Sequence, residues 1–232
     1  MKLDRGTYPL AVLFLGLILI GLCVFGSKTA TVMAESERLA LGHVLVIDPG
    51  HGGIDGGATS CTGKLESTYN LQISVRLRDL FHLMGYRTKM IRTTDTSVYT
   101  SGDTIAAQKM SDLKERVRIA NERENNVLIS IHQNYFSDSR YSGPQVFYPD
   151  TTGSKELAEA LQTALVTALN PGSNRKCKQS SGIYLMEHMQ CTGVLIECGF
   201  LSNPVEEAKL SDAAYQQKLC CVIAATVCSS LN

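Results

Sequence analysis

The sequence predicts an α/β fold, because strand-like apolar segments alternate along the chain with segments of helical periodicity. Short runs of Val, Ile and Leu at residues 44–47, 127–131 and 194–196 are typical of strands that are covered on both faces. Between the first two runs, Ile73 and Leu77 begin an apolar stripe at helical spacing. We therefore expect layers of helix packed on a sheet.

The same patterns predict the other elements of the fold. A helix starts near Glu66 and, with Met84 on its inner face, stops at Gly85. The polar residues 93–110 have no period and predict a long loop. Further strands are expected at 86–92, 145–148 and 183–185. A second helix is expected over residues 112–123, a third is expected to start at an N-cap formed by Ser154, and a closing helix is expected to begin near Asp212.

The chain divides into an N-terminal targeting segment, residues 1–34, and one folded domain, residues 35–232. Lys2 and Arg5 precede an uncharged run over residues 9–26 of the 232-residue chain. This run is longer than a typical signal core and just short of a comfortable membrane span, so cleavage and retention as an anchor both stay open. The positive flank predicts an extracytoplasmic domain that meets the membrane only through this segment.

Charge and cysteine content narrow the function classes. Lys and Arg together number 22, as do Asp and Glu, and this neutral balance argues against nucleic acid as a partner. Of the 8 cysteines only Cys23 lies in the N-terminal apolar run, so an odd number remains and cannot all pair within the chain. Most fall on apolar faces and are expected to be buried thiols: Cys191, Cys198, Cys220, Cys221 and Cys228. Cys198 is the one candidate for a catalytic thiol, although no base is marked for it.

The chain is organised around residues 43–59, HVLVIDPGHGGIDGGAT. After the apolar strand, Pro49 and Gly50 form a turn, and His51 follows at the strand end, where open α/β sheets bind ligands. A phosphate-binding loop is the main alternative for such a glycine-rich turn. However, Ala58 stands where a P-loop needs lysine, and Asp55 stands where a dinucleotide turn needs its third glycine. A metal held by His51 fits better, provided that the chain supplies further ligands.

Three apolar strands each lead into a polar side chain that can bind a metal or transfer a proton: His51, His132 and Glu197. Glu66 precedes the first helical stripe and can turn back to the same edge of the sheet. Two histidines and one carboxylate with an open fourth position form a known catalytic zinc set, and a second glutamate is then free to act as a base. The four residues together predict a zinc hydrolase.

Each of these residues also has a purely structural interpretation. A histidine at a strand end often only hydrogen-bonds its loop, which holds for His51 and for His132 taken singly. Glu66 alone is explained by the dipole at a helix start. Glu197 alone could be a structural acceptor, although a buried carboxylate is costly without a partner. The zinc hypothesis therefore rests on the combination of residues.

Six segments jointly resemble the zinc-dependent N-acetylmuramoyl-L-alanine amidases of bacterial cell walls, over nearly all of residues 44–231. They are DPGHGGIDGGA (48–58), GKLE (63–66), IRTTD (91–95), RVRIAN (116–121), ISIHQN (129–134) and LIECGFLSN (195–203). The resemblance implies one Zn²⁺ per chain, bound by His51, Glu66 and His132, with Glu197 as the catalytic carboxylate. It also implies a mixed, mostly parallel sheet with helices on both faces, as in zinc exopeptidases. The implied substrate is peptidoglycan, cut between the muramic lactyl group and L-alanine.

Two short segments, QVFY (145–148) and ECGF (197–200), resemble the germination-specific branch of this family. That branch implies spore-cortex peptidoglycan as substrate, ahead of muramic δ-lactam formation, and an accessory lipoprotein as a partner. Two alternatives stay open at this point. One is a zinc peptidase that cuts within the peptide stem, and the other is a non-catalytic protein that binds the wall or activates another hydrolase.

Overall fold

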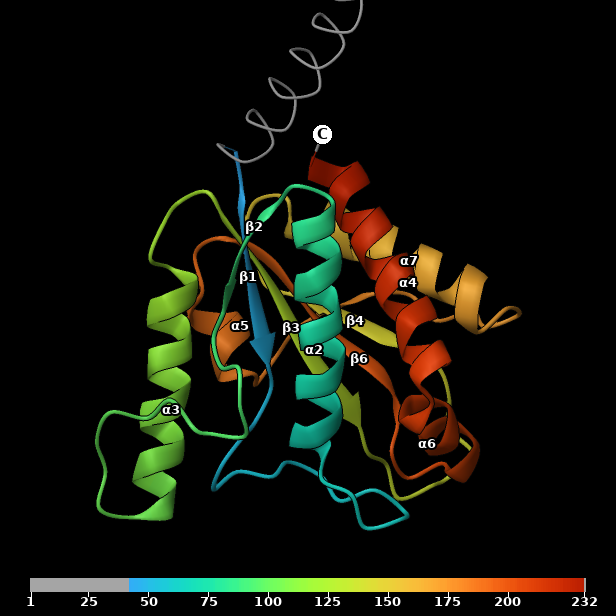
Figure 1. Cartoon of the computed structure of the whole chain (residues 1–232), viewed down its shortest axis with the longest axis horizontal. Helices are drawn as coiled ribbons and strands as arrows, with labels where there is room; N and C mark the ends of the chain where they lie inside the picture. Colours follow the sequence, from blue (N-terminus) through green and yellow to red (C-terminus); the bar gives the residue numbers. More distant parts are fainter. Residues whose placement is uncertain (1–41, 232) are drawn as a thin grey trace, which may run out of the picture. The chain divides into compact units, whose positions relative to one another are not determined.

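The computed structural model describes residues 42–231, which form a six-stranded sheet with helices on both faces (Figure 1). The elements are β1 (Val44–Pro49), α2 (Glu66–Leu83), β2 (Arg87–Met90), α3 (Ile105–Ala120), β3 (Asn126–Asn134), β4 (Gln145–Tyr148), α4 (Ser154–Leu169), β5 (Lys178–Gln179), α5 (Tyr184–His188), β6 (Thr192–Phe200), α6 (Pro204–Ser211) and α7 (Ala213–Leu231). The predicted segment 1–34 lies outside the described residues. Within them, no helix combines the length and the apolar character that crossing a bilayer requires.

The strand order is β2-β1-β3-β6-β4-β5. Every neighbouring pair runs parallel except β4 and β6, which run antiparallel. The predicted mixed, mostly parallel sheet is therefore confirmed. Its central strands β1 and β3 are buried almost throughout, as their continuous apolar sequences require.

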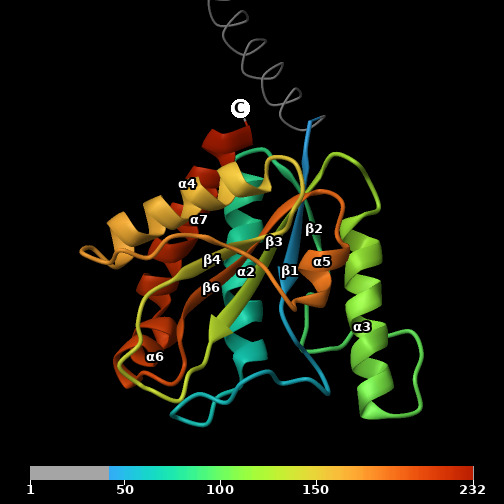
Figure 2. The same cartoon turned by 180° about the vertical axis from the view of Figure 1, so that it is seen from behind.

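The two faces of the sheet are covered by different helices (Figures 1 and 2). Helix α2 packs against β1 and β3, and α7 packs beside α2. On the other face, Val46, Leu128 and Leu195 share a buried cluster with residues of α3 and α5. Full burial of one such side chain stabilises the fold by about 1.5–3 kcal/mol. These two apolar layers hold the strand ends that carry the polar site.

Helix α2 follows its sequence pattern closely. Ile73, Leu77 and Phe81 are fully buried on one stripe. Gly85 ends the helix with φ of 84°, a conformation that glycine adopts without strain. The prediction was wrong for Met84, which lies beyond the last helical residue and is exposed.

The largest difference from the sequence prediction concerns residues 93–110. Helix α3 begins at Ile105, capped by the Thr104 side chain on the Ala107 amide, and it ends at Ala120, short of Arg123. The first turns of α3 are largely exposed, so they lack the apolar stripe that reveals a helix in a sequence.

Short apolar segments account for most of the other errors. Residues 183–185 were predicted as a strand, but Tyr184 begins helix α5, because so short a run fits either structure. Ser154 is the first residue of α4, and Gly153 is its N-cap. Strand β5 and helix α6 were missed, although Asn203 before Pro204 is a recognisable helix start that caps α6.

The cysteine predictions are largely confirmed. Cys191, Cys198, Cys220 and Cys228 are buried, and all cysteines of the described residues are free thiols. Cys221 is the exception, because it is exposed on the outer side of α7. Burial raises the pKa of the Cys198 thiol far above its usual value, which disfavours the reactive thiolate. A catalytic role for Cys198 is therefore not supported.

Candidate metal centre

The site begins at the turn after β1. His51 has φ of 59°, the only positive φ among non-glycine residues of the described chain. Such a conformation is uncommon and is retained where the surroundings hold it in place. At Gly50 an added Cβ would lie 2.2 Å from Nε2 of His132, so only glycine lets the two segments approach this closely.

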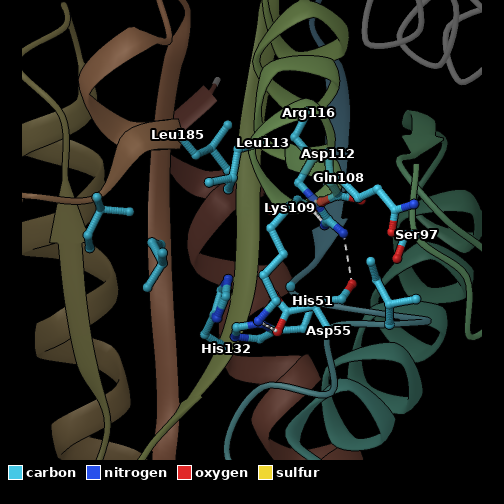
Figure 3. A pocket seen from close by; sticks show the side chains of 15 residues that line it. His51, Asp55, Ser97, Gln108, Lys109, Asp112, Leu113, Arg116, His132 and Leu185 are labelled. Carbon is cyan, nitrogen blue, oxygen red and sulfur yellow. Dashed lines mark hydrogen bonds and ion pairs between the residues drawn. The ribbon is translucent and has the colours of Figure 1, made fainter. Parts of the chain in front are cut away.

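Two buried arginines hold this turn by its carbonyl oxygens. Arg92 donates to Pro49 O at 2.9 Å and to Gly50 O at 3.0 Å. Arg116 donates to Pro49 O at 3.0 Å and to His51 O at 2.7 Å, the second of which is drawn in Figure 3. The turn is thus fixed by side chains from the strand end after β2 and from α3.

Burial of Arg116 is compensated by acidic partners. Its guanidinium forms ion pairs with Asp48 and Asp112. Burial raises the pKa of Asp48, but the charges of Arg116 and His132 and the hydrogen bonds from Ser130 and Arg116 together hold it below its usual value. Ser130 donates to the second oxygen of Asp48 at 2.7 Å. A charge network therefore underlies the turn.

His51, Glu66 and His132 come together in one cluster, with one ligand atom of each residue within 4.8 Å of the others. His51 Nε2 lies 3.3 Å from Glu66 Oε2, and His132 Nδ1 lies 3.0 Å from Glu66 Oε1. The two imidazole rings meet edge to face, with centroids 4.9 Å apart. Two ring nitrogens and one carboxylate oxygen are a donor set that suits a metal ion.

Glu66, at the start of α2, is positioned by several donors. The amides of Ala58 and Gln133 donate to its carboxylate at 3.0 and 3.1 Å, and Asn70 Nδ2 donates at 3.2 Å. Burial raises the pKa of Glu66, but the hydrogen bonds and charges of His132 and His51 lower it well below its usual value. Glu66 is therefore held ionised at the centre of the cluster.

The outer nitrogen of His51 is engaged by a carboxylate that the sequence interpretation did not assign. His51 Nδ1 lies 2.9 Å from Asp55 Oδ2, and Lys109 Nζ lies 2.8 Å from Asp55 Oδ1. A carboxylate on the far nitrogen of a ligating histidine is a common way to fix its tautomer and orientation. The i, i+4 spacing of His51 and Asp55 was the available signal, but nothing in the sequence revealed Lys109.

These acidic neighbours raise the pKa of His51. Burial lowers the pKa of His51, but the hydrogen bonds and charges of Glu66 and Asp55 raise it overall to about 9. The pKa of Asp55 lies below its usual value, since the hydrogen bonds of Lys109 and His51 outweigh the effect of burial. Without a metal, the cluster therefore holds a proton on His51 at neutral pH.

Glu197 lies beside this cluster on the neighbouring strand. The register of β3 and β6 pairs it with His132, and both strands continue past these residues. Its Oε2 atom is buried and has no hydrogen-bond partner among the described residues. Burial, with the charge of Glu66, raises the pKa of Glu197 to about 7. A carboxyl group with a pKa near neutrality can both take up and release a proton.

A pocket of about 220 Å³ opens on the cluster (Figure 3). We call it the α3 pocket, because five of its lining residues lie on α3. Its lining combines polar and apolar residues: Asp48, Gly50, His51, Ile54, Asp55, Ser97, Gln108, Lys109, Asp112, Leu113, Arg116, His132, Ile183, Leu185 and Leu195. The structure thus brings three of the four predicted site residues into one cluster and places Glu197 on the next strand.

An α/β sheet that carries a two-histidine, one-glutamate cluster near its strand ends is typical of metal-dependent hydrolases. The family model described as N-acetylmuramoyl-L-alanine amidase matches residues 45–229, and the chain belongs to this family. Its activity is amidase activity on peptidoglycan. The predicted family, fold and enzyme class are confirmed.

Individual relatives agree with this assignment. The germination-specific N-acetylmuramoyl-L-alanine amidase of Bacillus subtilis is 39% identical over 181 residues, covering 77% of this chain and 75% of the relative. The structure of the CwlD amidase from Clostridioides difficile in complex with the GerS lipoprotein has a TM-score of 0.77 at 36% identity. The alignment covers 82% of this chain and 98% of that one. The catalytic domain of CwlV from Bacillus (Paenibacillus) polymyxa has a TM-score of 0.68 at 27% identity, covering 81% and 97% of the two chains.

Proposed function

We propose that His51, Glu66 and His132 hold one zinc ion and that Glu197 moves the protons of amide hydrolysis. The observation that carries the proposal is the proximity of the three ligand atoms, within 4.8 Å, beside a carboxyl group whose buried oxygen finds no hydrogen-bond partner in the described part of the chain. Three protein ligands of this kind leave a position open, which is the arrangement of catalytic rather than structural zinc. Glu197 is then outside the ligand set and free to act.

When bound, zinc polarises the amide carbonyl and lowers the pKa of water. Glu197 accepts a proton from the water that attacks the carbonyl carbon. It then donates this proton to the amine of L-alanine, which cannot leave as an anion. Burial raises the pKa of Glu197 to about 7 in the metal-free cluster, which suits a group that must both accept and donate a proton. Asp55 orients His51, and the amide of Gln133 helps to orient Glu66.

We propose spore-cortex peptidoglycan as the substrate, in an extracytoplasmic location. The germination-specific name of the Bacillus subtilis relative and the predicted targeting segment 1–34 support this. We further propose an accessory lipoprotein as partner, because the CwlD amidase with 36% identity forms a complex with one. Removal of stem peptides from the cortex by this chain would then precede muramic δ-lactam formation.

Mass spectrometry of digested peptidoglycan tests the bond that is cut. The zinc-loaded protein is expected to release peptides that begin with L-alanine and to leave glycan without peptide. Chelation should stop this release, and readdition of zinc should restore it. Fragments cut only within the stem would identify a peptidase instead. Active protein without stoichiometric zinc would contradict the metal assignment.

A further inference from the structure

The α3 pocket offers a binding site whose ligand the catalytic assignment leaves open. We propose that it takes the first residues of the peptide stem and that Lys109 recognises a carboxylate on the residue after L-alanine. This inference rests on the proposed function, because it places the scissile amide at the metal cluster. Lys109 then acts as a specificity-determining residue for the stem, while the glycan stays outside.

The size and lining of the pocket favour a short peptide. Its volume of about 220 Å³ is below the range of about 300–1,000 Å³ typical of pockets for drug-sized ligands, which favours a segment of one or two residues. Leu113, Leu185 and Leu195 provide an apolar wall. Such a wall suits the methyl group of L-alanine and the aliphatic part of the next side chain. The pocket is continuous with the cluster through His51 and His132.

The cationic side chains that line the pocket differ in exposure and in how many hydrogen bonds they already make. Arg116 is buried and already donates to Asp48, Asp112 and the turn carbonyls. His51 belongs to the metal cluster. Lys109 has a side chain that is 46% exposed, and among the described residues it hydrogen-bonds only to Asp55. It is therefore the lining cation that a substrate anion can reach.

Lys109 is well placed for this contact. Figure 3 shows its side chain extending from α3 across the pocket toward Asp55, close to His51 and His132. An ammonium group has three donors, and Asp55 uses one of them. A carboxylate can accept another without displacing Asp55. Lys109 lies on the early turns of α3, within the segment 93–110 that the sequence predicted to be a long loop.

The test compares two glycan-linked stems that differ at one group. The residue after L-alanine carries either a free α-carboxylate or the corresponding primary amide. Values of kcat and KM are measured for wild type, Lys109→Met, Lys109→Arg and Lys114→Met, all loaded with zinc and checked for zinc content. Lys114 is the matched control, because it is an exposed lysine of the same helix that does not line the α3 pocket.

Wild type is expected to favour the acid over the amide by about two- to fivefold in kcat/KM, since a half-exposed ion pair is a modest interaction. The difference should lie in KM. Lys109→Met should abolish this preference with unchanged zinc content, whereas Lys109→Arg and Lys114→Met should keep it. An equal preference in wild type and Lys109→Met would overturn the proposal, as would the absence of any preference in wild type.

Calorimetry with the free peptides separates this result from a failure of the proposed function. Zinc-loaded wild type should bind the acidic stem peptide more tightly than its amide, and Lys109→Met should bind both equally. If neither glycan were cut at the L-alanine amide while this binding difference persisted, the assigned cleavage would be wrong. The assignment of the pocket as the binding site of the stem peptide would still hold. Equal binding of acid and amide by wild type would overturn the pocket assignment alone.

Discussion

His132 on β3 and Glu197 on β6 are paired across the parallel ladder, so the two side chains leave the same face of the sheet side by side. This register places the Glu197 carboxyl group, whose buried Oε2 has no hydrogen-bond partner within residues 42–231, beside the His–Glu–His cluster. His132 and Glu197 are therefore carried by the adjacent strands β3 and β6, whereas His51 lies in the turn after β1 and Glu66 at the start of α2. Rigid placement of this kind is what an acid–base group beside a metal requires.

The raised pKa of His51 predicts how metal binding depends on pH. A ligating histidine must be neutral, and without metal His51 holds its proton up to a pKa of about 9. Zinc affinity should therefore rise with pH up to about 9. Asp55→Asn removes one of the groups that raise this pKa, so it should shift the rise to lower pH. Titration of zinc by calorimetry between pH 6 and 9 measures both effects, and a flat wild-type profile would contradict them.

Gly50→Ala should damage the metal site without unfolding the protein. The new Cβ would lie 2.2 Å from His132 Nε2, so His132 has to move. We expect zinc affinity to fall at least tenfold, in the range typical when ligand support is lost. Gly63→Ala is the control, because the new Cβ there has no atom within 4 Å and meets only the strain of a backbone with φ of 89°. It therefore separates backbone strain from the contact with His132. Zinc retention by Gly50→Ala at wild-type affinity would argue against this contact.

Asp48 should stabilise the fold above its unfolded pKa. Its pKa is lowered in the folded protein, so the stabilisation is complete above about pH 4 and is lost as pH falls toward the folded pKa. Asp48→Asn leaves Arg116 with only Asp112 as an acidic partner, and should cost about 3 kcal/mol at pH 7. Urea unfolding at several pH values measures this cost.

The exposed pair Asp138 and Arg140 supplies the control for that experiment. Asp138→Asn removes an ion pair in contact with solvent and should leave the urea midpoint nearly unchanged. An equal loss of unfolding free energy in both variants would show that the charge network beneath the turn stabilises the fold no more than an exposed ion pair does. Arg116→Lys should behave like Asp48→Asn, because lysine cannot span both acids and the carbonyl oxygens.

An accessory lipoprotein is expected to act on zinc affinity or on turnover. The CwlD amidase of Clostridioides difficile was solved in complex with the GerS lipoprotein, which makes a lipoprotein of this kind the first candidate to test. Zinc affinity and peptide release should be compared with and without a purified candidate. An increase in either supports the partnership, whereas equal values would mean that the chain is self-sufficient toward that candidate.

The sequence predicted the fold and much of the site because both depend on local patterns. Continuous apolar runs located β1, β3 and β6, and the polar residues that follow or end those runs, His51, His132 and Glu197, could be identified from position alone. The division of roles between Glu66 and Glu197 needed the family resemblance, because two carboxylates near one edge are equivalent in a sequence.

The remaining parts of the site depend on contacts between distant segments. Lys109 reaches Asp55 across 54 positions of the chain, and Arg116 reaches the carbonyl of His51 across 65. Neither contact leaves a periodic trace. Helix α3 was also predicted to start too late, since its early turns are polar, and this hid the position of Lys109 on the pocket rim.

The central claim separates the metal ligand Glu66 from the proton carrier Glu197, and one comparison tests it directly. Zinc content, thermal stability and turnover are measured for Glu197→Gln and Glu66→Gln. Glu197→Gln is expected to keep its zinc and fold while turnover falls by about 10²–10⁴, the usual contribution of a positioned acid–base group. Glu66→Gln should lose zinc. Loss of zinc from Glu197→Gln, with retention by Glu66→Gln, would reverse the two roles and contradict the account.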